Sequence, residues 1–216
     1  MLTLCEELVC LSIHESKGRF IGSSQEPLKV GLGGSVLIEL SLLGKIKVTE
    51  NHRLQLIDDS KTDNECLDEA LSALKESEKE RKIGYWLNSL GRKKDKFSKQ
   101  IIESLFKKNI LTEEDDRFIW VVPSPLQPDK KASTKYWVLR RLRSALLESN
   151  EYQPRDIILL SLLRSLNMLD FVFLRDERKL ASRSINQLFY NQAMNDPVFQ
   201  TIEEIGTAIS EIVEED

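Results

Sequence analysis

Residues 31–46 read Gly31-Leu32-Gly33-Gly34-Ser35-Val36-Leu37-Ile38-Glu39-Leu40-Ser41-Leu42-Leu43-Gly44-Lys45-Ile46. The apolar side chains in this stretch recur at intervals of three and four residues, which is the spacing of an α-helix. They cover too much of the helix circumference for a helix that keeps one face in water. Glycines precede and follow the apolar run, as they do at helix ends. We therefore predict a buried central helix over Ser35–Leu43, with the rest of the chain packed around it.

The sequence on either side of this stretch predicts further helices. Thr3-Leu4-Cys5-Glu6 has the capping-box pattern that begins a helix, and that helix should end near Ile13. Apolar residues at helical spacing predict more helices over 63–75, 81–90, 97–108, 133–148, 157–167, 176–190 and 202–212. Nothing in the sequence indicates an internal repeat or a linker. We expect residues 1–216 to form a single globular domain of the mainly α class.

The remaining segments predict minor β-structure and loops. Lys45–Thr49 and Arg53–Ile57 alternate in polarity around a polar turn, which indicates a short β-hairpin. Phe118–Val122 reads as a strand because it is aromatic and β-branched. Phe171–Leu174 predicts a short strand or an extended segment. Residues 19–30 predict a loop, since glycine, serine and proline interrupt any regular pattern.

Composition excludes several classes of function. The 216 residues carry a net charge of −4, which argues against a general nucleic-acid binder but leaves room for a local basic patch. Three cysteines without a Cys-x-x-Cys pattern favour a reduced cytosolic compartment, and two histidines without nearby ligands predict no zinc site. Polar residues interrupt the apolar run Ile157–Leu174, so we expect it in the core. No secretory signal is evident, and any membrane contact should be peripheral.

Three patterns are candidates for chemistry, and none predicts catalysis. Gly31-x-Gly33-Gly34 offers either backbone N–H groups to an anion or a tight turn into the central helix. Asp68 and Glu69 diverge by about 100° on a helix, so helix capping explains them better than a catalytic pair. Glu39 either faces a polar rim or pairs with a buried cation, and the ion pair is favoured. The sequence has no nucleophile elbow, metal triad or phosphate loop. We predict a non-enzymatic protein without a cofactor.

The densest basic region is the candidate binding site. Six basic residues fall between positions 130 and 143, with only neutral residues among them: Lys130, Lys131, Lys135, Arg140, Arg141 and Arg143. Trp137, Arg140 and Arg141 share one side of the predicted helix. An indole and several guanidinium groups can hold a phosphorylated headgroup, because arginine grips phosphate at two points. The alternative is a solvated helix with Trp137 packed inward. A second basic run, Arg92–Lys96, is interpreted as a solvated helix face.

Several motifs, in one order, resemble a known family. They are Leu2-Thr3-Leu4 with Glu6-Glu7-Leu8, the stretch Gly31–Ile46, Thr62-Asp63 with Leu67-Asp68-Glu69-Ala70-Leu71, Trp86-Leu87 with Leu90, Ile110-Leu111-Thr112, Pro125-Leu126 and the helix Arg140–Glu148. Together they resemble the Golgi phosphoprotein 3 family, peripheral membrane proteins that bind phosphatidylinositol 4-phosphate. The resemblance implies a mostly α-helical domain with a short hairpin and no enzymatic activity. It also implies a cytosolic protein on a membrane, the Golgi in a eukaryote.

The family's headgroup residues carry over only in part. In eukaryotic members they are a tryptophan before the central helix, an arginine in the glycine turn, and two basic residues on a later helix. The matching positions here are Ser24, Gly33, Trp137 and Arg140. Only Arg140 keeps the expected chemistry.

Three hypotheses follow. The first is a peripheral module that binds anionic lipid headgroups through Arg140, with Lys135, Trp137, Arg141 and Arg143. The second is an adaptor of the same fold that captures tails of membrane proteins without lipid specificity. The third is a winged-helix DNA binder, because residues 101–122 read as a helix, a turn and a strand; the acidic net charge makes it the weakest.

Overall fold

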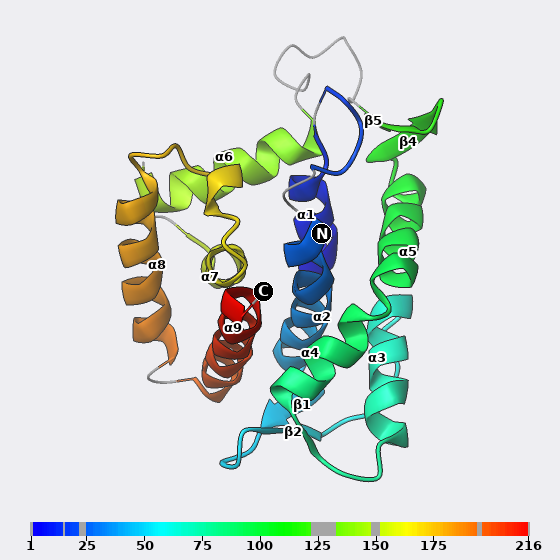
Figure 1. Cartoon of the computed structure of the whole chain (residues 1–216), viewed down its shortest axis with the longest axis vertical. Coiled ribbons are helices and arrows are strands. Elements are labelled where there is room, and N and C mark those ends of the chain that lie inside the picture. The colour runs from blue at the N-terminus through cyan, green and yellow to red at the C-terminus, as the bar shows by residue number, and fades with distance from the viewer. Residues whose placement is uncertain are drawn as a thin grey trace.

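The computed structural model describes residues 2–14, 16–21, 25–121, 133–147, 152–193 and 196–215. Its α-helices are α1 (Leu4–Ser12), α2 (Gln25–Leu42), α3 (Glu65–Glu76), α4 (Ile83–Gly91), α5 (Lys94–Lys107), α6 (Thr134–Leu147), α7 (Pro154–Ser165), α8 (Arg178–Ala193) and α9 (Pro197–Glu215) (Figure 1). A 3-10 turn, η3 (Leu169–Phe171), follows α7. The mainly α class is therefore confirmed.

The predicted central helix is confirmed in α2. Its apolar side chains are fully or almost fully buried, including Leu32, Val36, Leu37 and Leu40. In Figure 1, α2 lies in the middle of the molecule, with α9 on one side and α3 and α5 on the other. It packs against α1, α4 and α9, so neighbours on several sides use its broad apolar surface.

The predicted start of the central helix is wrong. α2 begins at Gln25, so the expected loop over 19–30 ends earlier, and the three glycines lie inside the helix. Pro27 is compatible with the helix because it occupies the first turn. The glycines permit close packing instead of a turn. A Cβ atom at Gly34 would lie 2.5 Å from Ile209 Cδ1, and one at Gly31 would lie 2.7 Å from Leu166 Cδ1.

The first helix and the hairpin follow the sequence prediction. Thr3 and Glu6 form the capping box at the start of α1, and Ile13 caps its end. Strands β1 (Ile46–Val48) and β2 (Arg53–Leu56) pair antiparallel, with Ile46 opposite Leu56. A third short strand, β3 (Arg81–Lys82), pairs with β2.

The other β-structure differs from the prediction. The strand expected over Phe118–Val122 is β5 (Arg117–Trp120), and it pairs with β4 (Leu111–Glu114), which we had not predicted. The extended segment expected at Phe171–Leu174 is wrong. This stretch continues from η3 in tight turns, with Phe173 N–H donating to Leu169 O, because this conformation buries Val172 and Phe173.

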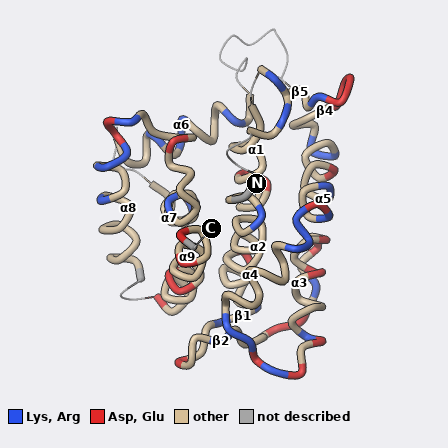
Figure 2. The backbone as a smooth tube through the Cα atoms, in the orientation of Figure 1, with Lys and Arg blue, Asp and Glu red and all other residues tan. Residues whose placement is uncertain are grey.

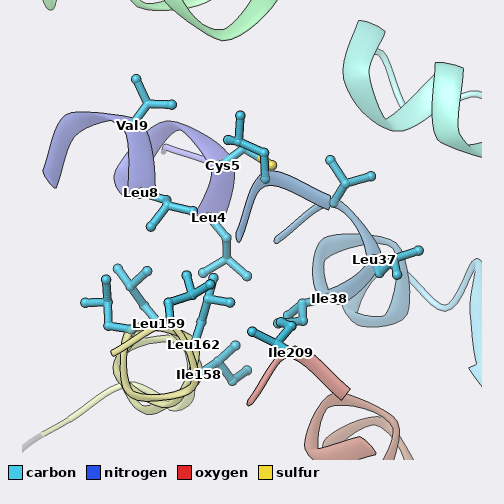
Figure 3. Close-up of a cluster of buried hydrophobic side chains, with 14 of the residues drawn as sticks. Leu4, Cys5, Leu8, Val9, Leu37, Ile38, Ile158, Leu159, Leu162 and Ile209 are labelled. Atoms are coloured by element: carbon cyan, nitrogen blue, oxygen red, sulfur yellow. The ribbon is translucent and has the colours of Figure 1, made fainter. Parts of the chain in front are cut away.

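Helices from both ends of the chain build the core. Figure 3 shows Leu4 and Leu8 of α1 facing Ile158 and Leu159 of α7, beside residues of α2 and Ile209 of α9. α7 is buried on nearly every side, as predicted for the interrupted apolar run. Within the described ranges, no helix combines the length and the apolar character needed to span a bilayer.

Candidate functional site

Lys135 lies at the first turn of α6 and is buried. Its Nζ donates to the main-chain oxygens of Leu11 (2.9 Å) and Ile13 (2.5 Å). These carbonyl groups belong to the C-terminal end of α1, where the helix dipole favours a cation. Lys135 therefore fixes the beginning of α6 to the end of α1.

Arg141 joins three helices through two buried carboxylates. Its Nη2 lies 2.7 Å from Glu7 Oε1 in α1, and its Nε lies 2.6 Å from Asp156 Oδ1 in α7. Burial lowers the pKa of Arg141, but the two carboxylates outweigh this effect and hold that pKa above its ordinary value. Burial also raises the pKa of Glu7 more than Arg141 lowers it. The positive charge of Arg141 is therefore balanced by carboxylates of the protein itself.

Arg143 connects α6 to the segment before α8. Both of its terminal nitrogens lie 2.8 Å from the Glu177 carboxylate, and Nη1 also donates to Val172 O. The hydrogen bonds from Arg143 lower the pKa of Glu177. This two-point pair holds the start of α8 against α6.

Trp137 and Arg140 face outward. Trp137 is 42% exposed, so its indole is not packed inward. The Cζ of Arg140 lies 5.5 Å from the Trp137 ring centroid, within the range of a cation–π contact. Tyr136, 45% exposed, meets Trp137 edge-on at a centroid distance of 5.5 Å. Arg140 has no carboxylate partner among the described residues.

More exposed apolar side chains occur where α6 ends and α8 begins. They are Leu147 on α6, Leu174 just before α8 and Leu180 on α8. The exposed cations Arg175 and Lys179 lie in the same segment. In Figure 2, lysine and arginine positions gather at this corner, on the left end of α6 and the start of α8, with acidic positions beside them. Here, too, exposed apolar and basic side chains occur together.

The sequence matches the Golgi phosphoprotein 3 (GPP34) family over residues 4–205. The chain belongs to this family. It is also 30% identical, over 169 residues, to the vacuolar protein sorting-associated protein 74 of Eremothecium gossypii. That alignment covers 69% of this chain and 50% of the relative, so the chain spans about half the length of the relative it matches.

The arginine of the Golgi phosphoprotein 3 family's glycine turn has no equivalent space here. Its position, Gly33, lies inside α2 and faces α4: an added Cβ would be 3.2 Å from Leu87 O and 3.3 Å from Leu90 Cβ. Ser24, Lys130 and Lys131 lie outside the described residues.

The other candidate residues from the sequence form ion pairs or hydrogen bonds within the fold. Glu39 pairs with Arg155 of α7, which confirms the favoured ion pair. Asp68 accepts hydrogen bonds from Thr62, and Glu69 pairs with Lys93 and Lys96. In the described part of the chain, no three His, Cys, Asp or Glu residues are grouped to hold a metal ion, and the three cysteines are buried free thiols.

Sequence reasoning missed two features of the site. Tyr136 and Leu147 belong to the same exposed stripe as Trp137 and Arg140, and helical spacing alone could have revealed it. No local sequence pattern indicates the carboxylate partners of Arg141 and Arg143, because these partners lie far away in the sequence.

Proposed function

We propose that this member of the Golgi phosphoprotein 3 family is a non-enzymatic peripheral membrane protein that binds anionic phospholipid headgroups through Trp137 and Arg140. The observation that carries the proposal is an exposed guanidinium stacked on an exposed indole, without a carboxylate partner among the described residues. Arginine binds phosphate through two parallel hydrogen bonds. An indole is suited to the boundary between water and lipid, since it is both apolar and a hydrogen-bond donor.

The other residues of the predicted site support this surface from within. Lys135, Arg141 and Arg143 use their charges on main-chain oxygens and carboxylates of α1, α7 and the α8 start. They hold α6 in place, so we assign direct headgroup contact to Arg140. This narrows the site predicted from sequence.

One cation is a weak anchor by itself. A basic residue near an anionic bilayer contributes about 1 kcal/mol, whereas burying a leucine side chain contributes about 1.5–3 kcal/mol. The exposed Leu147, Leu174 and Leu180, with Arg175 and Lys179, supply both kinds of contact. Membrane binding then rests on a surface that extends from α6 to the start of α8.

The headgroup preference is broader in this proposal than in the eukaryotic family members. Gly33 supplies no cation, and an added Cβ there would be tight against α4, 3.2 Å from Leu87 O. We therefore propose binding to anionic headgroups in general, with phosphatidylinositol 4-phosphate as one ligand. The location that follows is the cytosolic face of a membrane, the Golgi in a eukaryote.

Vesicle flotation tests the proposal. The protein is mixed with vesicles of phosphatidylcholine alone, or with added phosphatidylserine or phosphatidylinositol 4-phosphate. Arg140→Glu should weaken binding to both anionic mixtures about tenfold or more, because it replaces an attraction with a repulsion. Arg81→Glu is the matched control: Arg81 also lies over an exposed aromatic ring, 5.2 Å from the centroid of Tyr85, but at the β3–α4 end. Equal losses in both variants would refute the assignment.

The vesicle mixtures also separate the alternatives. Flotation only with phosphatidylinositol 4-phosphate would mean that specificity is kept by a rebuilt site. Equal flotation with both anionic lipids would mean a general electrostatic surface. No flotation with any mixture would reject the proposal and favour the adaptor hypothesis.

The DNA-binding alternative has little support. α5 and the β4–β5 hairpin form the helix and strands that suggested it. The hairpin turn, however, carries four exposed acidic residues, Glu113 to Asp116. These charges would repel a phosphate backbone.

A further inference from the structure

A groove of about 790 Å³ lies between α7, α8 and α9. Arg164 enters it from α7, and Arg183, Asn186 and Gln187 enter it from α8. Two carboxylates of α9, Glu203 and Glu214, also line the groove. The groove shares α8 with the membrane surface proposed above, but none of the residues assigned to that surface lines it.

Arg164 differs from the other half-buried arginines. Arg141, Arg143 and Arg155 each lie within 2.9 Å of a carboxylate oxygen. Arg164 forms no ion pair with any described residue. Its Nε is buried without a hydrogen-bond partner, as is the Nε of Arg155, so the missing carboxylate is what distinguishes Arg164. Burial lowers the pKa of Arg164, and the nearby charge of Glu203 offsets only part of this effect.

A buried polar atom without a hydrogen-bond partner is costly, and the Arg164 Nε is such an atom. The rest of the guanidinium lines the groove without a carboxylate partner among the described residues, so an anion in the groove would supply the missing counter-charge. Arg183 adds a second positive charge, and the Asn186 and Gln187 amides add neutral donors. Two guanidinium groups with amide donors match the several oxygens of a phosphoryl group better than a single carboxylate.

Two hydroxyl groups of α9 that line the groove indicate what accompanies the phosphoryl group. Thr207 Oγ1 donates to Glu203 O and Ser210 Oγ donates to Gly206 O, both within α9. Because each hydroxyl proton is donated to a main-chain oxygen of α9, the hydroxyl oxygens are left to accept a hydrogen bond from a ligand. A hydroxylated molecule bearing a phosphoryl group has both kinds of complementary atom.

We propose that the groove between α7, α8 and α9 binds the phosphoryl group of a hydroxylated phosphate ester, through Arg164 and Arg183. Glu203 and Glu214 oppose the anion and limit its affinity. This site is separate from the proposed headgroup contact at Trp137 and Arg140, so either can fail without the other.

The test is isothermal titration calorimetry of the full chain with inorganic phosphate and with glycerol 3-phosphate, at constant ionic strength set with chloride. Arg164→Gln should weaken binding about tenfold or more, and Arg183→Gln less, because Arg183 is more exposed. Glu203→Gln should strengthen binding several-fold by removing a repulsion. Arg117→Gln, at an exposed residue of β5 outside both proposed sites, is the matched control and should leave the affinity unchanged.

Two results would overturn the proposal. One is no saturable binding of either compound to the wild-type protein. The other is binding that Arg164→Gln and Glu203→Gln leave unaltered. If Arg164→Gln does not fold, as judged by circular dichroism, Glu203→Gln and Arg183→Gln still decide, since both change exposed side chains.

A second measurement separates a soluble ester from a lipid as the source of the phosphoryl group. It uses flotation with phosphatidylcholine vesicles that contain phosphatidic acid, in an Arg140→Glu background that weakens the α6 contact. Flotation that is lost on adding Arg164→Gln would assign the groove to a lipid phosphate. Calorimetric binding of glycerol 3-phosphate without such flotation would assign it to a soluble ester.

Discussion

Glu39 of α2 and Arg155 of α7 form a two-point ion pair between the middle and the C-terminal half of the fold. Glu39 Oε1 lies 3.1 Å from Arg155 Nη1, and Oε2 lies 2.9 Å from Nη2. The same carboxylate accepts from Leu4 N–H, and the same guanidinium donates to Leu2 O. The pair therefore also fixes the start of α1, which explains why a carboxylate occurs within an otherwise apolar helix.

Glu39→Gln should destabilise the protein by about 3 kcal/mol, because it leaves the Arg155 guanidinium mostly buried without a counter-charge. The measurement is the midpoint of urea unfolding. Glu78→Gln, at an exposed residue, controls for the loss of one negative charge. The double variant Glu39→Leu with Arg155→Met should recover much of the loss, since it removes both charges together. A loss within about 0.5 kcal/mol, which is typical of surface changes, would contradict the structural role.

Two neighbouring arginines on α6 should separate stability from membrane binding. Arg141→Gln should lower the free energy of unfolding by about 3 kcal/mol, because Glu7 and Asp156 lose their shared cation. Arg140→Gln should change it by less than about 0.5 kcal/mol, because its guanidinium is exposed. In flotation at a temperature where both remain folded, only Arg140→Gln should reduce vesicle binding. Equal flotation losses would mean that Arg141 also contacts lipid.

The sequence predicted what depends on local pattern. Short stretches of about ten residues contain the patterns that predict the broad apolar face of α2, the capping box at Thr3 and the alternation in β1 and β2. Local spacing predicts that the glycines begin the central helix, but they lie inside α2. Their lack of a Cβ lets side chains that are distant in the sequence, such as Leu166 and Ile209, pack closely. Local sequence does not contain that information.

The candidate site was predictable in part for the same reason. The helix that carries Trp137 and Arg140 follows from its apolar spacing, and so does the shared side of these two residues. The different roles of the basic residues do not follow from this spacing. Glu7 lies 134 positions from Arg141, and only the fold decides that Arg141 pairs inward while Arg140 stays exposed. The density of basic residues in the sequence predicts lipid contact equally for Arg140 and Arg141.

The Lys45–Asp58 pair beside the β1–β2 hairpin should make stability depend on pH. A hydrogen bond from Lys45 Nζ, 2.6 Å away, lowers the pKa of Asp58 from 3.8 to about 2. Because the folded-state pKa is depressed, the contribution is present above pH 3.8 and is lost as the pH falls through about 2. The urea midpoints of the wild type and Asp58→Asn should therefore differ at neutral pH and converge as the pH falls through this window. Asp170→Asn, at an exposed carboxylate, controls for the loss of one negative charge.

Restoring the family's arginine at Gly33 should damage the fold and leave lipid preference unchanged. A Cβ at this position would be tight against Leu87 O, a main-chain atom that can yield only if α4 moves. Gly33→Arg should lower the melting temperature by several degrees, corresponding to a loss of about 1–3 kcal/mol for overpacking. Gly84→Ala in α4 is the matched control, because nothing lies within 4 Å of its added Cβ. That change should stabilise the protein by about 0.4–1 kcal/mol. A Gly33→Arg variant that melted like the wild type and gained preference for phosphatidylinositol 4-phosphate would show that α2 and α4 can separate to form the family's pocket.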